Sequence, residues 1–277
     1  MPRVFGGRRT TYLLLSGVRP IRSVRLTSGI ELLPVRSIPS PNEVLFRVEG
    51  IDIHFVALFV PWVEAQLRVS GIGSEDVATR AWNALWDALL LSAIYNVPTT
   101  CTLQSTSPID RLGKSSKINV IHHHFYDHPA REDAYEIGEE ESLWLEANFS
   151  TAQELLVDHK FQTAVHCLAT YRWHSLPRAQ MSLLWAGIES LFAVDSEIVF
   201  RISLYVAKFL SPNDQSKQKS IFESVRELYK YRSQAVHGGK MKGNPRDSVI
   251  KSSELLSQLV RTCIERNALP DAKSLVP

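Results

Sequence analysis

The segment YRSQAVHGG, from Tyr231 to Gly239, sets an arginine and a histidine five positions apart and follows them with a glycine pair. Histidine titrates near neutral pH and can accept or deliver a proton. Arginine carries a permanent charge on a planar fork that matches a phosphate group. Together the two side chains could move the proton of a nucleophile and bind the charge that develops on phosphorus. Arg232 and His237 are therefore the candidate catalytic pair.

The spacing of this pair raises a geometric question. On an ideal α-helix, residues five apart lie about 140° from each other around the axis, so Arg232 and His237 do not share a face. Gly238 and Gly239 would let the chain leave the helix in a left-handed conformation, which could bring the two side chains together. Alternatively, two copies of the helix could meet across a twofold axis and line one cleft. The sequence leaves both arrangements open.

RNA is the substrate that such a pair suits best. Its 2′-hydroxyl is an internal nucleophile beside the phosphodiester, so a protein need supply only a group that moves a proton and a cation for the crowded phosphorus. The negative end of the helix dipole would favour protonated histidine. We expect no metal and no other cofactor for this chemistry.

Further polar residues surround the pair in sequence. Glu189 lies within an apolar helix face, where a lone carboxylate is costly, so we expect it to have a partner. That partner could be Arg201 in a structural ion pair, or Glu189 could orient Arg232 or His237. Three cations beyond the motif could hold flanking phosphates of RNA, or could belong to an ordinary solvated loop: Lys240, Lys242 and Arg246.

Three segments carry a family resemblance: LLWAGIESLF at 183–192, VFRIS at 199–203 and LYKYRSQAVHGG at 228–239. Together they resemble the HEPN superfamily, in particular its Apea-like branch. The resemblance covers roughly residues 148–267 and implies an all-helical bundle with an Rx4-6H motif, which Arg232 and His237 match. It also implies a supporting acidic residue at Glu189 and a supporting arginine at Arg201.

What the resemblance implies about function is a metal-independent endoribonuclease that acts as a homodimer with a shared cleft, often in toxin or anti-phage systems. Ser233 departs from the family pattern, because active members often have Asn, Asp or His directly after the motif arginine. The alternative is a HEPN-like module without catalysis that dimerises or binds a nucleotide or partner. A neutralising or trigger partner is compatible with either function.

The 277 residues suggest two domains of ordinary size. Residues 1–147 combine strand-and-turn patterns with a helix expected over Ser74–Tyr95, which predicts an α+β domain of unknown role, for which a sensor or a ligand-binding domain are the options. Residues 148–277 predict an all-α, HEPN-like helical bundle. Its five helices are expected over 151–173, 177–194, 196–210, 218–237 and 247–267. The first domain has 14 Lys and Arg against 17 Asp and Glu, and the second has 17 against 12, so a polyanion partner suits the second better.

Two local expectations concern the first domain. The stretch Ile51–Val60 begins with polar and apolar alternation and then becomes apolar, which predicts a strand that enters a core. The acidic run Glu136–Glu141 predicts a solvated connection between the domains.

Other residues with chemical potential have simpler explanations. The histidines between His122 and His128 could bind a metal, as in a metal hydrolase, although strand-end histidines are more common. Tyr171–His174 could stack on a base, or could simply pack against the next helix. The three cysteines lack CxxC spacing, so we expect a cytoplasmic protein with neither a disulfide framework nor a cysteine zinc site. The apolar runs are too short to cross a bilayer, so we expect no membrane span.

Overall fold

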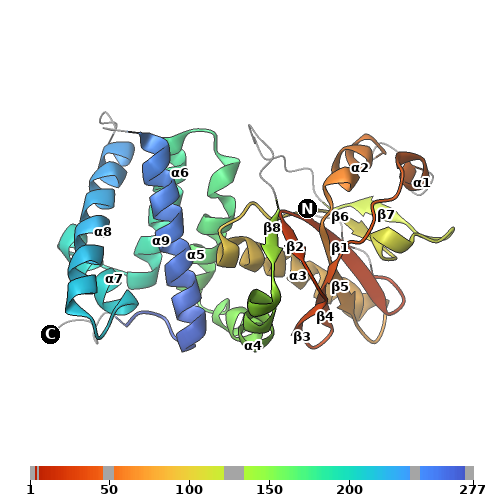
Figure 1. The fold of residues 1–277 in the computed structure, drawn as a ribbon, viewed down its shortest axis with the longest axis horizontal. Helices are drawn as coiled ribbons and strands as arrows, with labels where there is room; N and C mark the ends of the chain where they lie inside the picture. Colours follow the sequence, from red (N-terminus) through yellow and green to blue (C-terminus); the bar gives the residue numbers. More distant parts are fainter. Residues whose placement is uncertain (1–3, 5, 46–52, 122–133, 238–243, 272–277) are drawn as a thin grey trace. The chain divides into compact units, whose positions relative to one another are not determined.

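The structure is a computed structural model that describes residues 4, 6–45, 53–121, 134–237 and 244–271 (Figure 1). The chain forms two compact units. Unit 1 contains the described residues up to Ser92, those between Val97 and Ile121 and those from 134 to Ser150. Unit 2 contains Ala93–Asn96 and the chain from Thr151. The division that the sequence suggested after residue 147 falls inside a helix, α4, which spans Glu139–Leu155.

Unit 1 is built on an antiparallel sheet of six strands in the order β3-β4-β5-β1-β6-β7. Its central strand β1 is buried along almost its whole length. The run of three leucines in its sequence, TTYLLLS, suits this buried position. A second, parallel pair joins β2 and β8. The strands span Thr10–Ser16 (β1), Val18–Pro20 (β2), Val24–Thr27 (β3), Ile30–Pro34 (β4), Ala65–Ser70 (β5), Thr100–Ser105 (β6), Ile118–Val120 (β7) and Tyr135–Ile137 (β8).

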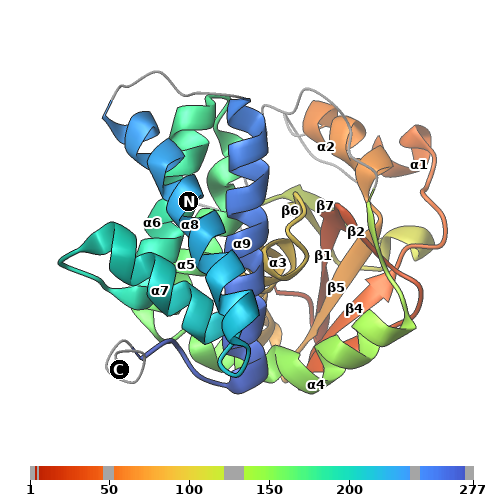
Figure 2. The same cartoon turned by 60° about the vertical axis from the view of Figure 1, so that its left-hand side comes forward.

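Helices supply the packing partners of this sheet. α3 spans Ser74–Tyr95, as the sequence predicted, and lies beside the sheet (Figure 2). Its first turn carries Glu75 and Asp76, where the positive end of the helix dipole favours acids. Two short helices, α1 (Pro41–Leu45) and α2 (Ile53–Phe59), contribute Val44 and Val56 to a buried apolar cluster with Leu14 of β1. The α+β prediction for this half is confirmed.

The predicted strand over Ile51–Val60 is wrong. Over the described residues it forms α2 and a single 3-10 turn, Val60–Trp62. The buried residues Val56 and Val60 are four positions apart, which is the spacing of one helix face. A short apolar run is compatible with either element, and here packing against the apolar cluster selects the helix.

The acidic run Glu136–Glu141 is not a solvated connection. Its first residues belong to β8, and Glu139, Glu140 and Glu141 form the first turn of α4. Three acids at a helix N-terminus are favoured by the dipole, and Leu145 and Phe149 then bury one side of the helix.

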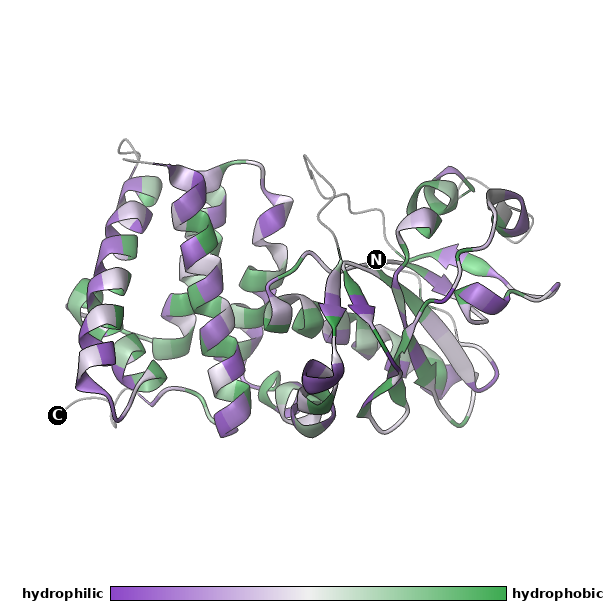
Figure 3. Ribbon diagram, in the orientation of Figure 1, coloured by the Kyte–Doolittle hydropathy of each residue, from purple (hydrophilic) through white to green (hydrophobic). Residues whose placement is uncertain are grey.

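Unit 2 is helical, as predicted. The predicted helix over 151–173 is interrupted, because Asp158 caps the N-terminus of a new helix by accepting a hydrogen bond from the backbone N–H of Lys160. Green and purple residues alternate along α8 and α9 in Figure 3, as expected for amphipathic helices. The helices span His159–Thr170 (α5), Pro177–Phe192 (α6), Ile198–Leu210 (α7), Gln215–Val236 (α8) and Pro245–Arg266 (α9).

Close packing holds α5, α6 and α9 together. Gly187 of α6 lies at the crossing, and a Cβ atom there would stand 2.8 Å from Leu256 Cδ2 and 3.1 Å from Cys167 Cβ. The buried Trp185 donates its ring N–H to Ser252 Oγ of α9 at 3.2 Å. These contacts make α6 the central helix on which the candidate site is built.

Candidate functional site

Arg232 points from α8 to Glu189 of α6. Its Nη2 atom donates a hydrogen bond to Glu189 Oε2 at 3.0 Å and lies 2.9 Å from Oε1. The two side chains are only 22% and 28% exposed. Within the described part of the chain, the buried Arg232 Nε donates no hydrogen bond and the buried Glu189 Oε1 accepts none. The pair is thus half-buried and leaves hydrogen-bonding capacity unused.

Aromatic rings pack against one side of this ion pair. The Arg232 guanidinium carbon lies 5.3 Å from the centre of the Tyr229 ring, within cation–π range. Tyr229 in turn meets Trp185 edge to face, with ring centres 5.1 Å apart. Both rings belong to the segments that carry the family resemblance, which by itself indicates no role for either ring. The Tyr229 ring thus packs between Trp185 and the guanidinium of Arg232.

Burial changes the acidity of this cluster. Desolvation raises the pKa of Glu189 above its ordinary value of 4.5, while the charge of Arg232 and its hydrogen bond act in the opposite direction. Burial also raises the pKa of the Tyr229 phenol. The Glu189 carboxylate therefore binds a proton more readily than an exposed glutamate does.

His237 lies at the end of the same helix. α8 ends at Val236, and His237 is its cap, with φ −90° and ψ 15° and with its backbone N–H donating to Ser233 O at 3.0 Å. Its side chain is exposed and makes no hydrogen bond or ion pair with any residue that the structure describes. Gly238 and Gly239 lie outside the described residues. Arg232 and His237 thus share a helix end, but no bond joins them in one copy.

The sequence interpretation missed Arg178. This residue lies in the first turn of α6, and its Nη1 atom donates to the carbonyl oxygens of Gln234 at 3.1 Å and Ala235 at 3.2 Å. Helix C-termini leave carbonyls without partners, and the last turn of α8 has no basic residue of its own. Arg178 satisfies two of these carbonyls directly before His237. No pattern in the sequence indicates which helix supplies this cation.

The expected pairing of Glu189 with Arg201 is wrong. Arg201 Nε instead donates to Glu197 Oε2 at 3.3 Å, four residues earlier at the N-cap of α7. Ser233 is part of α8, where its carbonyl receives the His237 amide. Arg246 is exposed in the first turn of α9 rather than on a loop. Lys240 and Lys242 lie outside the described residues.

Tyr171–His174 is used in packing. Arg172 Nη2 donates to the Asn96 carbonyl at 2.6 Å and to its side-chain oxygen at 3.1 Å, just past the end of α3. Its guanidinium also lies 4.5 Å from the centre of the Tyr171 ring. Through these contacts the Arg172 guanidinium binds the polar groups that follow the C-terminus of α3.

The histidines from His122 to His128 lie outside the described residues. Within the ranges that the structure does describe, no three His, Cys, Asp or Glu side chains gather as metal ligands would.

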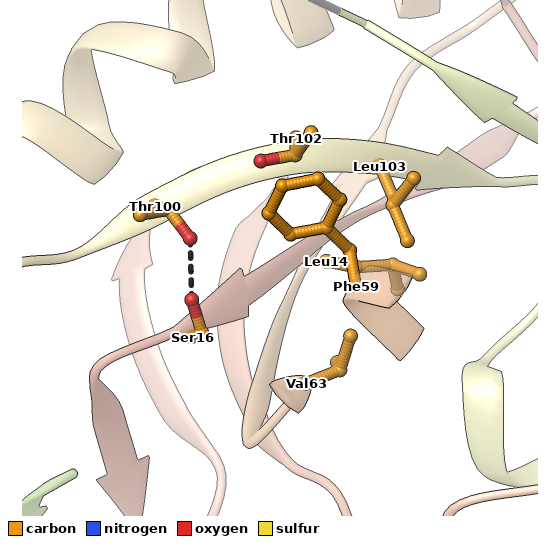
Figure 4. A pocket seen from close by; sticks show the side chains of 7 residues that line it. All are labelled: Leu14, Ser16, Phe59, Val63, Thr100, Thr102 and Leu103. Carbon is orange, nitrogen blue, oxygen red and sulfur yellow. Dashed lines mark hydrogen bonds between the residues drawn. The ribbon is translucent and has the colours of Figure 1, made fainter. Parts of the chain in front are cut away.

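A small hollow in unit 1 is closed to ligands. Seven residues line it (Figure 4), and its free volume is about 10 Å³, room for a water molecule at most. Leu14, Phe59 and Leu103 supply its apolar wall, and a hydrogen bond joins Ser16 and Thr100 at one side.

Comparison of the chain with known protein families, with curated proteins and with solved structures gave no match. Among the described helices, none combines the length and the apolar character that crossing a membrane requires.

Proposed function

We propose that unit 2 is a HEPN-like domain and that Arg232 and His237 cleave RNA without a metal ion. The observation that carries this proposal is the ending of α8. Arg232 is held at a polar and aromatic cluster, and His237 is exposed at the C-cap of the same helix. A phosphate-binding cation and a proton-moving group near each other are the minimum that RNA cleavage through its 2′-hydroxyl needs.

In the proposed reaction His237 takes the proton of the ribose 2′-hydroxyl. The 2′-oxygen then forms a bond to phosphorus, and the bond from phosphorus to the 5′-oxygen breaks. A proton delivered to the 5′-oxygen completes the step, so the products are a 2′,3′-cyclic phosphate and a 5′-hydroxyl. Protonated His237, or the His237 of a second copy, delivers that proton.

Arg232 stabilises the charge on the phosphorane in this mechanism. Within the described part of the chain Arg232 donates a hydrogen bond only through Nη2, and Nε is buried without a partner, so Nη1 is the donor left for a phosphate oxygen. Glu189 acts as a positioning residue by holding Nη2. Arg178 acts as a second positioning residue, because it fixes the carbonyls that precede His237.

A homodimer suits the separation of the two side chains. In one copy Arg232 turns toward α6 while His237 caps the helix, so a second copy could complete each cleft. Arg246, Lys240 and Lys242 would hold flanking phosphates, and Arg201 would support the bundle. A cytoplasmic toxin or anti-phage effector with a trigger or neutralising partner is the setting that the resemblance favours.

A second function deserves a test because Arg232 already has an anionic partner. The Glu189 carboxylate, 2.9 Å away, competes with phosphate for the same guanidinium, and Ser233 departs from the pattern of active members. In that case unit 2 dimerises or binds a nucleotide or protein without cleaving RNA.

Expression in a bacterial host distinguishes the two functions. The wild-type chain should arrest growth and generate new RNA 5′-hydroxyl ends, and His237→Ala should do neither at equal protein level. The matched control is His159→Ala, which changes an exposed histidine at the start of α5. Equal growth and equal RNA ends for wild type and His237→Ala would exclude the nuclease and favour the binding module.

A further inference from the structure

A hollow of about 380 Å³ lies in unit 1 between the β3–β4 hairpin and α4. Figures 1 and 2 both draw α4 next to this hairpin. The volume lies within the roughly 300–1,000 Å³ of typical small-molecule sites. Its lining is charged and polar: Ser23, Arg25, Glu31 and Glu146.

Strand register places three of the charges near this hollow in one row. Arg25 of β3 lies opposite Glu31 of β4, and Glu31 lies opposite Arg68 of β5. Side chains that are directly opposite share a face of the sheet, with Cβ atoms about 5 Å apart. Glu31 pairs with Arg68, whose Nη2 lies 2.6 Å from Oε1. The side chain of Arg25 has no hydrogen bond or ion pair with any residue in the described ranges.

The other acid of the lining already has its cation. Arg22 donates from Nη1 to Glu146 Oε1 at 2.7 Å and from Nη2 to Oε2 at 3.2 Å. These bonds and the charge of Arg22, with smaller contributions from the backbone N–H and the charge of Arg25, hold the pKa of Glu146 below its usual range. Both carboxylates are thus paired with arginines, Arg22 being shared between Glu146 and Glu139, and Arg25 is the lining cation whose guanidinium makes no hydrogen bond to a described residue.

We propose that this hollow binds a small zwitterion of the α-amino acid class. The ligand carboxylate meets the guanidinium fork of Arg25, which matches it in shape and charge. The ligand ammonium donates to Glu31, whose carboxylate has further acceptor sites beside its bond to Arg68. A molecule with negative charges alone would face Glu31 and Glu146, and a polyamine would face Arg25. The proposed site does not depend on nuclease activity in unit 2.

Calorimetric titration of the full chain tests this site, with each of the twenty proteinogenic amino acids as a separate probe. At least one should bind with one-to-one stoichiometry, and at about ten times its Kd should raise Tm by roughly 3 °C. Arg25→Gln should weaken that binding at least about tenfold, because the carboxylate loses its bidentate partner. Arg36→Gln, at an exposed arginine beyond β4, is the matched control and should leave binding unchanged. Tm without ligand confirms that both variants fold.

Inorganic phosphate and putrescine serve as probes that carry one sign of charge. Binding of either one, with none of the amino acids, would overturn the zwitterion assignment. The site itself would be refuted if no amino acid binds wild type, or if Arg25→Gln binds as tightly as wild type.

Discussion

Two clusters in this protein are each built from arginine and glutamate, and they differ in how deeply the glutamate is buried. In unit 1, Arg22 joins Glu139 and Glu146 on α4 with several hydrogen bonds, and the pKa of Glu146 falls. In unit 2, Arg232 gives Glu189 one hydrogen bond in a half-buried setting, and the pKa of Glu189 rises. Desolvation exceeds attraction only in unit 2. That cluster includes Arg232 of α8, the helix that the candidate acid–base histidine caps, and perturbed groups of this kind are typical of functional sites.

The largest expected effect comes from removing the cation of the half-buried cluster. Arg232→Ala leaves Glu189 without its partner, so we expect the free energy of unfolding to fall by about 2 kcal/mol, less than for a fully buried pair. Chemical denaturation at pH 7 measures this loss. Arg22→Ala is the comparison and should cost less, because Glu139 and Glu146 are 62% and 33% exposed against 28% for Glu189. An equal loss in the two variants would remove the distinction between the clusters.

Opposite pH dependence of the two glutamates is the second prediction. The pKa of Glu189 is raised in the folded chain, so its contribution to stability is present below pH 4.5 and is lost as pH rises through the raised pKa. The pKa of Glu146 is lowered, so its contribution is present above pH 4.5 and is lost as pH falls through the lowered pKa.

Denaturation of wild type, Glu189→Gln and Glu146→Gln between about pH 3 and pH 8 tests these signs. The difference in unfolding free energy between wild type and each variant should change with pH in opposite directions. Curves of the same sign would mean that burial does not distinguish the two sites.

Arg178 should have a smaller effect that is confined to the end of α8. Arg178→Ala frees the carbonyls of Gln234 and Ala235, so we expect a loss of about 1 kcal/mol and faster amide hydrogen exchange at His237. Arg226→Ala changes an exposed arginine two turns earlier on the same helix and should leave that exchange unchanged. Exchange at His237 that is the same with and without Arg178 would argue against its positioning role.

The smallest effect on stability belongs to His237. Its exposed side chain makes no polar contact with the described residues, so His237→Gln should change the free energy of unfolding by less than about 0.5 kcal/mol. Thermal unfolding measures this difference. A large loss would indicate a structural role for the histidine.

Periodicity was informative where the helices are long, and it failed where elements are short. α3 could be predicted with both ends, because its capping acids, its apolar spacing and the following proline agree. α2 could not, because seven residues fit a strand or a helix equally well. The partner of Glu189 could not be predicted either. Arg201 is nearer in sequence, but antiparallel packing of α6 and α8 brings Arg232 to it. Such contacts depend on which helices are neighbours, and sequence spacing does not encode that.

The most direct test of the central claim is the rate at which the purified chain cleaves total cellular RNA in the presence of EDTA. We predict that wild type leaves 2′,3′-cyclic phosphate and 5′-hydroxyl ends, and that His237→Gln, equally stable, lowers the rate at least about 100-fold. Wild-type chain that leaves the RNA intact, or His237→Gln that cleaves as fast as wild type, would contradict the account.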